Sequence, residues 1–377
     1  MVRVLTGWVD VRNKGDKAEG IYGGAPVARK GTTIERKVMS RRGFLKLGGV
    51  GLAGTALLGA SGCNATSGGG TRTFTYAYEQ PEETSHGIAA NIFEEKLEEV
   101  SGGAMAIEQY PAGQLGGEPA LLQKVLSQDV DFINSSTANG SLLAPQSGVF
   151  SLHYLFDSVE HNLRVVTDER INDLYSEMTR AVVDGGHALT LYSSPLRNFY
   201  SRDTEVRSVD DIQNQKIRVQ ATRTEDITFA AYEAQTVHMQ FSEVFTSLQT
   251  GVIDMAENAL MYYSTAGHYD VAPIMSLSEH EGNTQIIWVT DKAWNSMSEE
   301  ERGWAQAAAD EVRTTASRKG FESTLEDRQE YQDEGVQFIE DVDKGSFKEI
   351  SVPLQDRIAE DLGETAMQIV ERVRELQ

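Results

Sequence analysis

The chain has 377 residues, 40% of them hydrophobic, which suits about two domains of an ordinary soluble protein. It carries 34 basic and 57 acidic side chains, and the acidic excess lies beyond position 63: residues 64–377 hold 23 basic and 53 acidic residues, a net charge of −30. Such a surface repels polyanions and argues against nucleic acid as a partner, and a salt-loving source is one explanation for it.

The first 63 residues are predicted to be a leader. Residues 1–38 show no apolar periodicity and cannot bury a core, and Met39 is a plausible true start. Residues 40–46 read SRRGFLK, which matches the twin-arginine export signal at each specified position. The apolar residues 47–60 follow, too few to span a hydrocarbon core of about 30 Å.

Cys63 is the only cysteine of the chain, so no intrachain disulfide can form. It ends the run Ala-Ser-Gly-Cys, which resembles the cleavage site of a lipoprotein signal. We therefore expect residues 39–63 to be a twin-arginine lipoprotein signal, Cys63 to carry the lipid, and residues 64–72 to be a flexible tether. The folded part then lies outside the cytoplasmic membrane, anchored to its outer face. The alternative is an unmodified cysteine in a disordered leader.

A glycine pattern in the leader invites a different interpretation. Gly49, Gly51 and Gly54 satisfy G-x-G-x-x-G, but no strand precedes them and no acidic residue follows at the spacing of a ribose ligand. We reject dinucleotide binding and expect no cofactor.

Hydrophobic periodicity then predicts alternating elements. Segments in which apolar and polar residues alternate are predicted to be strands, and segments in which apolar residues recur every 3.6 residues are predicted to be helices. The two kinds of segment follow one another in turn, which is typical of an α/β domain with a parallel sheet. Ser298 and Glu301 form a capping box that starts a long polar helix, roughly 45 Å in length and able to lie across two domains. The expected strands are 73–78, 105–110, 130–135, 188–192 and 284–289, and the expected helices are 82–101, 121–126, 298–331 and 354–376.

Residues 216–258 read as strand, helix, strand, helix, strand, with polar residues where strands end. In the first strand Ile217 and Val219 share one face, so Arg218 points away from the core. α/β proteins bind ligands in the crevice at such strand ends, and Arg197 also follows a predicted strand. Basic residues are scarce beyond position 63, so an arginine at a strand end is a candidate for ligand binding. The alternative for both arginines is a surface salt bridge.

Signs of catalysis or metal binding are missing from the sequence. The seven histidines have no spacing that places two ligands on one helix face, Cys63 lies in the leader, and no nucleophile elbow, phosphate loop or calcium loop occurs. We predict neither catalytic residues nor a metal.

Several motifs in combination resemble the substrate-binding proteins of tripartite ATP-independent periplasmic (TRAP) transporters, the DctP-like family. They are Gln114-Leu115-Gly116 with Asp129 to Phe132, then Arg197, then Lys216 to Val219, then Phe241 to Phe245, and finally Leu248 to Asp254 with Glu257-Asn258. The resemblance covers roughly residues 74–338.

This resemblance implies a two-lobed α/β fold of the type II periplasmic-binding-protein kind, with a long helix spanning both lobes. Lobe I would hold residues 73–194 and about 283–315, and lobe II residues 195–282 and about 316–377. It implies capture of a small organic acid and its delivery to a TRAP-type membrane permease, with no enzymatic activity. The ligand-binding residues it implies are Arg218 for the carboxylate, Arg197, Asn258 and Glu257 of the Glu-Asn motif, and Phe241 as an aromatic wall.

Two departures from the family pattern bear on the ligand. Gln220 and Ala221 follow Val219 where many relatives have a proline and then a polar residue, and Ser135 and Ser136 stand where sugar-acid binders place a glutamate. Ser136 is also a candidate ligand-binding residue. Glu79, near the end of the first strand, faces the expected cleft and is a candidate for a ligand hydroxyl or amine. Ectoine-type zwitterions, C4 acids and other organic acids remain open, as do a secreted enzyme on a similar scaffold and a receptor that presents its ligand to a chemosensor.

Overall fold

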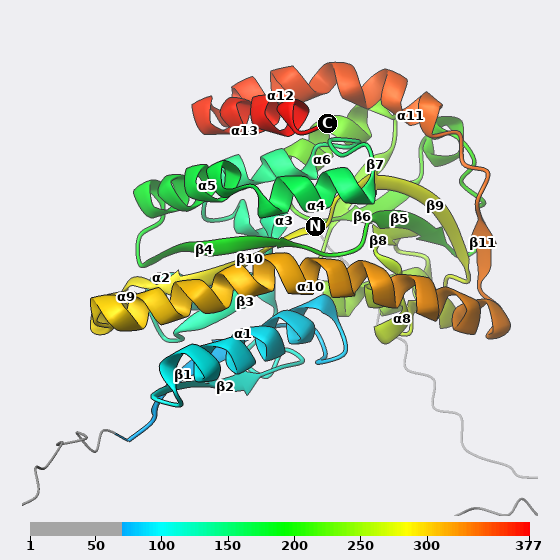
Figure 1. Ribbon diagram of the computed structural model, residues 1–377. Coiled ribbons are helices and arrows are strands. Elements are labelled where there is room, and N and C mark those ends of the chain that lie inside the picture. Colours follow the sequence, from blue (N-terminus) through cyan, green and yellow to red (C-terminus); the bar gives the residue numbers. More distant parts are fainter. Residues whose placement is uncertain (1–69) are drawn as a thin grey trace, which may run out of the picture. The chain divides into compact units, whose positions relative to one another are not determined.

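A computed structural model describes residues 70–377, with the side chains of all but residues 323–327. The expectations for the leader, the export signal, lipidation of Cys63 and the start of the tether lie outside the described residues. Within residues 70–377 two β-sheets are flanked by helices, which confirms the expected two-lobed α/β fold (Figure 1). No helix of this part is both long and apolar enough to cross a membrane.

The first sheet has five strands in the order β2-β1-β3-β10-β4. Strands β1, β2 and β3 are parallel as expected, but β10 runs antiparallel to both β3 and β4, so the sheet is mixed. The antiparallel strand arises because β10 returns from the second sheet instead of following a crossover helix. The strands are β1 (Arg72–Ala77), β2 (Met105–Tyr110), β3 (Phe132–Ser136), β4 (Gly186–Ser193) and β10 (Thr284–Thr290).

Alternation along these strands fills a core on each face of the first sheet. In β10, Ile286 and Trp288 pack on one face while Ile287 and Val289 pack on the other. Most helices that cover this sheet come from the first half of the chain, and three more from the C-terminal third are described below. The former, together with α9, are α1 (Ser85–Ser101), α2 (Glu118–Ser127), α3 (Thr137–Gly140), η1 (Pro145–Ser151), α4 (Val159–Thr167), α5 (Glu169–Val182) and α9 (Asp291–Ser296).

The second sheet has six strands in the order β11-β9-β5-β8-β6-β7 and is also mixed. Residues 216–258 supply three of its strands in the expected alternation of strand and helix. The strands are β5 (Arg197–Ser201), β6 (Lys216–Val219), β7 (Gln235–His238), β8 (Met255–Asn258), β9 (Ile274–Glu281) and β11 (Gln337–Ile339). Its helices are η2 (Val209–Ile212), α6 (Arg223–Ala231), η3 (Phe241–Glu243), α7 (Val244–Thr250), α8 (Leu260–Thr265), η4 (His268–Asp270), α11 (Lys344–Ser351) and η5 (Val352–Leu354).

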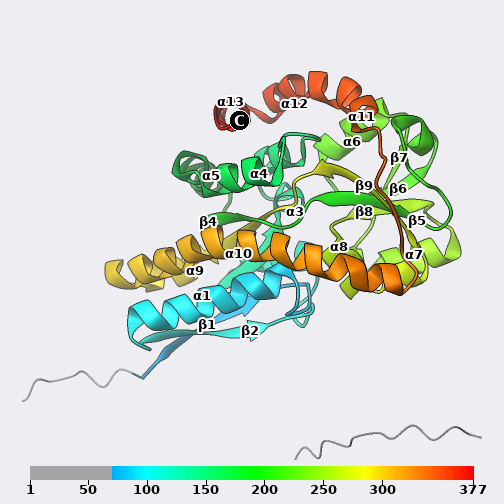
Figure 2. The ribbon, with the colours of Figure 1, turned by 45° about the vertical axis from the view of Figure 1, so that its right-hand side comes forward.

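The chain crosses between the sheets at two short segments, 194–196 and 282–283, and along helix α10 (Glu299–Asp333). Its 35 residues give a length of roughly 52 Å. It packs on α1 and β4 beside the first sheet and on α8 beside the second, as Figures 1 and 2 show. The long helix that spans both lobes is thereby confirmed. We propose that residues 194–196 and 282–283 act as hinges.

The C-terminal helices differ from the expectation in two ways. The single helix expected over 354–376 is two helices, α12 (Gln355–Leu362) and α13 (Glu364–Glu375), because Gly363 adopts φ 109°, a backbone angle that ends a helix. Both helices pack into the core of the first sheet through Ile358 and Ile369, whereas the sequence predicts that about 316–377 belong to lobe II. Amphipathic spacing shows that a face is buried but not which partner buries it.

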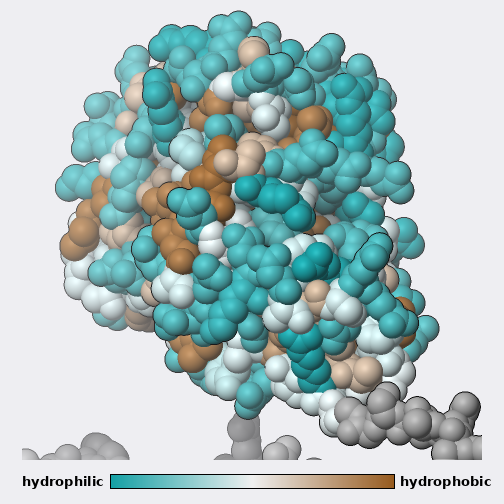
Figure 3. All heavy atoms as spheres, turned by 90° about the vertical axis from the view of Figure 1, so that its left-hand side faces the viewer, coloured by the Kyte–Doolittle hydropathy of each residue, from teal (hydrophilic) through white to brown (hydrophobic). Residues whose placement is uncertain are grey.

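The surface agrees with the strong negative charge. The face seen in Figure 3 is mostly hydrophilic. Among the described side chains, the exposed large apolar residues are scattered along the chain: Leu126, Leu142, Val182, Val252, Val352 and Met367.

The capping box of α10 yields a stability prediction. The Ser298 hydroxyl accepts from the Glu301 amide at 3.2 Å, and the Glu301 carboxylate accepts from the Ser298 amide at 2.7 Å. We expect Ser298→Ala to lower the free energy of unfolding by about 1 kcal/mol, measured by urea denaturation. Thr314→Ala, an exposed site in the same helix, is the control, and equal effects of the two changes would contradict the cap's contribution.

Candidate functional site

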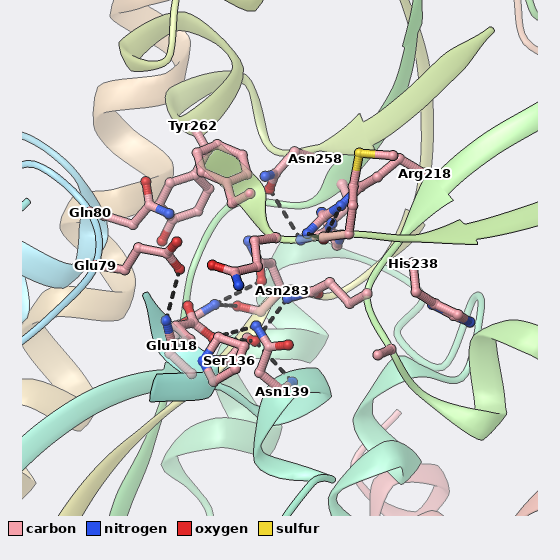
Figure 4. A pocket seen from close by; sticks show the side chains of 18 of the residues that line it. Glu79, Gln80, Glu118, Ser136, Asn139, Arg218, His238, Asn258, Tyr262 and Asn283 are labelled. Atoms are coloured by element: carbon pink, nitrogen blue, oxygen red, sulfur yellow. Dashed lines mark hydrogen bonds between the residues drawn. The ribbon is translucent and has the colours of Figure 1, made fainter. Parts of the chain in front are cut away.

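A cavity of about 290 Å³ opens where strand ends of the two sheets meet (Figure 4). Loops after β1 and β3 form one wall, and residues at the ends of β5, β6 and β8 form the other. Six of the seven expected ligand-binding residues line it: Glu79, Ser136, Arg197, Arg218, Phe241 and Asn258. Glu257 is the exception, because its side chain points into the protein and binds Arg197.

Arg218 is a buried cation without a carboxylate partner. Ile217 and Val219 pack into the core of the second sheet, so Arg218 between them faces the cavity, and it is only 5% exposed. Its Nε and Nη2 donate to the Met239 carbonyl at 3.3 and 3.1 Å. Among the described side chains, no carboxylate oxygen lies within 4 Å of its nitrogens, and Glu257 and Glu79 act on it only from farther away. Burial lowers the pKa of Arg218, yet a guanidinium stays protonated in proteins.

Arg197 has the same charge but a different environment. Its Nη2 donates to the Glu257 carboxylate at 2.6 Å and to the Glu257 carbonyl at 2.9 Å, and its Nε binds the same carboxylate. Burial disfavours both charges, but the pairing outweighs it, raising the pKa of Arg197 and lowering the pKa of Glu257 to about 2. Glu257 therefore neutralises the charge of Arg197. Its carboxylate is used in this ion pair and does not face the cavity, where the family resemblance predicts it to contact a ligand. Nη1 of Arg197 donates to Asn258 Oδ1 at 3.1 Å on the cavity side.

The opposite wall is acidic. Glu118 is 4% exposed, and its Oε2 accepts from the Ser136 amide at 2.9 Å, the Ser136 hydroxyl at 2.8 Å and the Asn139 side chain at 2.7 Å. Glu79 accepts from the Glu118 amide at 3.1 Å. Burial, followed by repulsion from Glu118, raises the pKa of Glu79 to about 7. Near neutral pH this carboxyl can therefore either donate or accept a hydrogen bond.

Gln220 connects the two walls. It follows β6, and its Nε2 donates to the Ser136 hydroxyl, at the end of β3, at 2.8 Å. Gln220 and Ser136, which both differ from the residues that the family pattern has at these positions, thus contact each other across the cavity. The contact holds the strand ends of the two sheets together on this side.

An aromatic edge completes the cavity. Phe241 lies 5.2 Å from the ring of His268, centroid to centroid, and Tyr262 contributes from α8. His86 also lines the cavity and hydrogen bonds to Gln285 at 2.9 Å. Several residues that line the cavity were not predicted from the sequence. Glu118 could have been, since it follows the Gln-Leu-Gly motif and is the acidic residue in the first turn of α2. The missed residues that carry polar groups are Gln80, His86, Glu118, Asn139, Gln220, His238, Gln240, Tyr262, Asn283 and Gln285.

The cavity is therefore polarised, with guanidinium groups on one wall and carboxyl groups on the other. Arg218 offers a fork suited to a carboxylate, and Glu79 with Asn258 offers partners for hydroxyl or ammonium groups. Such a site binds a small molecule that carries a carboxylate at one end and hydrogen-bond donors at the other.

Comparison with known proteins agrees with this class of site. Residues 76–361 match the family described as "Bacterial extracellular solute-binding protein, family 7" (DctP). The uncharacterized protein YiiZ of Salmonella typhimurium is 30% identical over 271 residues, which are 71% of this chain and 81% of YiiZ. The ectoine-binding periplasmic protein TeaA of Halomonas elongata is 25% identical over 326 residues, 85% of this chain and 94% of TeaA.

A solved structure shares the architecture. It is a TRAP periplasmic solute-binding protein of Xanthobacter autotrophicus with bound β-D-galacturonate, which superposes with a TM-score of 0.74 at 27% identity over 81% of this chain and 100% of its own. The chain belongs to the DctP family of extracellular solute-binding proteins.

The raised pKa of Glu79 predicts a pH-dependent stability. Because folding raises this pKa from 4.5 to about 7, the stabilisation is complete below about pH 4.5 and is lost as the pH rises through about 7. We expect Glu79→Gln to keep that stabilisation, so that between pH 5 and 8 the variant gains about 1–3 kcal/mol in free energy of unfolding relative to the unaltered protein.

Urea denaturation of the ligand-free protein at pH 5, 6.5 and 8 measures this difference. Glu83→Gln removes a carboxylate at an exposed position nearby and is the control: at pH 8 its free energy of unfolding should differ less from that of the unaltered protein than Glu79→Gln does. If the free energies of unfolding of Glu79→Gln and the unaltered protein differ by the same amount at all three pH values, Glu79 does not titrate between pH 5 and 8.

Proposed function

We propose that this protein captures a small organic acid outside the cytoplasmic membrane and delivers it to a TRAP-type membrane permease. The observation that carries the proposal is Arg218, a buried guanidinium that faces the cavity with no carboxylate partner in residues 70–377. A ligand carboxylate supplies the missing charge. Membership of an extracellular solute-binding family supports the same role, and relatives in that family bind uronates and ectoine.

Export and anchoring belong to the proposal. The twin-arginine motif at residues 40–46 and the lipoprotein-like site at Cys63 support export and attachment to the outer face of the cytoplasmic membrane. Neither binding nor delivery requires a covalent step, so the proposed role is that of a transport protein and not of an enzyme.

Closure of the two lobes accompanies binding. The cavity walls come from different sheets, so a ligand that bridges Arg218 and Glu79 makes both contacts only when the sheets are close. Such a ligand shifts an open and closed equilibrium toward the closed form. The crossings at 194–196 and 282–283 absorb the backbone change.

Substitution of Arg218 tests the proposal. Native mass spectrometry of the purified protein identifies any co-purified acid, and a panel of uronates, aldonates, C4-dicarboxylates and ectoine covers the remaining classes. We expect at least one of these acids to bind the unaltered protein and thereby raise its melting temperature. Arg218→Ala should weaken its binding at least about tenfold per lost charge-assisted hydrogen bond, while Arg218→Lys, which cannot present a planar fork, retains part of the affinity.

Arg223→Ala is the matched control, because Arg223 lies in the same segment but its side chain is 68% exposed and pairs with Asp361 at the surface. It should bind as the unaltered protein does. If Arg218→Ala folds and binds the acid with unchanged affinity, Arg218 is not the carboxylate site.

A further inference from the structure

A second buried polar cluster lies behind Arg197, at the point where the chain crosses between the sheets. It consists of residues no more than 4% exposed, here called the crossing cluster: His153, Arg197, Glu225, Glu257, His280 and Glu281. Arg197 and Glu281 are register partners on β5 and β9, the strands next to the two crossings. Of the six, only Arg197 lines the ligand cavity.

The charges of this cluster do not balance. One guanidinium faces three carboxyl groups: Glu257 takes most of its hydrogen bonds, and Glu281 lies 3.3 Å from its Nε. Glu225 and Glu281 are in contact with each other. With neutral imidazoles and ionised carboxylates the cluster carries a net charge of −2. Either protons shared by the carboxyl groups or a divalent cation must compensate it.

The geometry favours a cation. One nitrogen each of His153 and His280 and one carboxylate oxygen of Glu281 lie within 4.8 Å of one another. Glu225 lies beside these three: its Oε2 is hydrogen bonded to His153 Nε2 at 3.3 Å, a contact that a bound ion would replace. Among the described side chains, His280 Nε2 is buried with no hydrogen-bond partner, and Glu281 Oε2 is also buried without a hydrogen bond, with only the ion-pair contact to Arg197 Nε at 3.3 Å. Glu257 Oε2, at 3.8 Å from His280 Nε2, is too distant to supply one.

The remaining ring nitrogens are held in place. His280 Nδ1 hydrogen bonds to the Ser278 hydroxyl at 2.7 Å, and His153 Nδ1 to the Tyr232 hydroxyl at 3.1 Å. When each Nδ1 carries the proton, the Nε2 lone pairs of both rings point toward the carboxylates. A hydrogen-bonded Nδ1 that orients Nε2 is the usual arrangement around metal-bound histidine.

We propose that His153, His280, Glu281 and Glu225 bind one divalent transition-metal ion, with zinc the best match to two imidazoles and two carboxylates. Bonds of about 2.0–2.2 Å require the donor atoms, three of which now lie within 4.8 Å of one another, to draw together around the ion. The site is buried and has no open position, so the ion is structural. It ties the end of β9 to α6 and to the segment after η1, and thus fixes one crossing. This site goes beyond the absence of metal ligands expected from sequence, and it is independent of which acid the cavity binds.

Zinc binding to the chelator-stripped protein tests the site. We expect one equivalent of ZnCl₂ to bind by calorimetry and to raise the melting temperature, and His280→Gln and Glu281→Gln to weaken binding at least tenfold. His187→Gln is the matched control, since His187 is also a buried histidine near a carboxylate, with its Nδ1 3.7 Å from Asp291, but it lies on β4 outside both the crossing cluster and the ligand cavity. It should bind zinc as the unaltered protein does.

Anomalous diffraction at the zinc edge from zinc-soaked crystals of the unaltered protein decides the matter even if the variants fail to fold. A peak between the Nε2 atoms of His153 and His280 supports the proposal. No zinc bound, or a peak in the ligand cavity or on the acidic surface, overturns it and leaves shared protons as the charge compensation of the cluster. Loss of zinc with retained acid binding separates this result from a failure of the proposed transport role.

Discussion

The unpaired charge of Arg218 is the constraint on which the rest of the site depends. Burying a guanidinium is unfavourable unless an anion accompanies it, and Arg197, its neighbour in the cavity, has one in Glu257. Within the described part of the chain, Arg218 hydrogen bonds to the Met239 carbonyl and is in ion-pair contact with no carboxylate. A protein that binds and releases an acid needs this difference, because a guanidinium neutralised from within cannot attract a ligand carboxylate. In the proposed role, a ligand carboxylate supplies the anion that Arg218 lacks.

The fold makes this arrangement possible by bringing strand ends from two sheets together. β6 and β8 carry Arg218 and Asn258 to the cavity from the second sheet, while the ends of β1 and β3 bring Glu79 and Ser136 from the first. The walls therefore differ in charge because they come from different lobes. In the proposed mechanism, a ligand with a carboxylate and donor groups contacts both walls at once, so its binding favours the approach of the lobes.

Local patterns in the sequence predicted a large part of this structure. Strand alternation placed Arg218 opposite Ile217, and the box at Ser298 marked the start of α10 correctly. Interactions between distant residues could not be predicted in this way. Glu257 reads as one half of a ligand motif, and only the pairing of β5 with β8 shows that it neutralises Arg197. The crossing cluster was not predicted for the same reason. Its two histidines, His153 and His280, lie far apart in sequence and meet only where the sheets join.

The most direct test of the central claim is a crystal structure of the protein with its co-purified or best-binding acid. We predict that both oxygens of a ligand carboxylate lie within hydrogen-bonding distance of the Arg218 guanidinium, with the rest of the ligand directed toward Glu79 and Asn258. A ligand whose carboxylate binds elsewhere in the cavity, with the Arg218 guanidinium hydrogen bonded only to protein groups, would contradict the account.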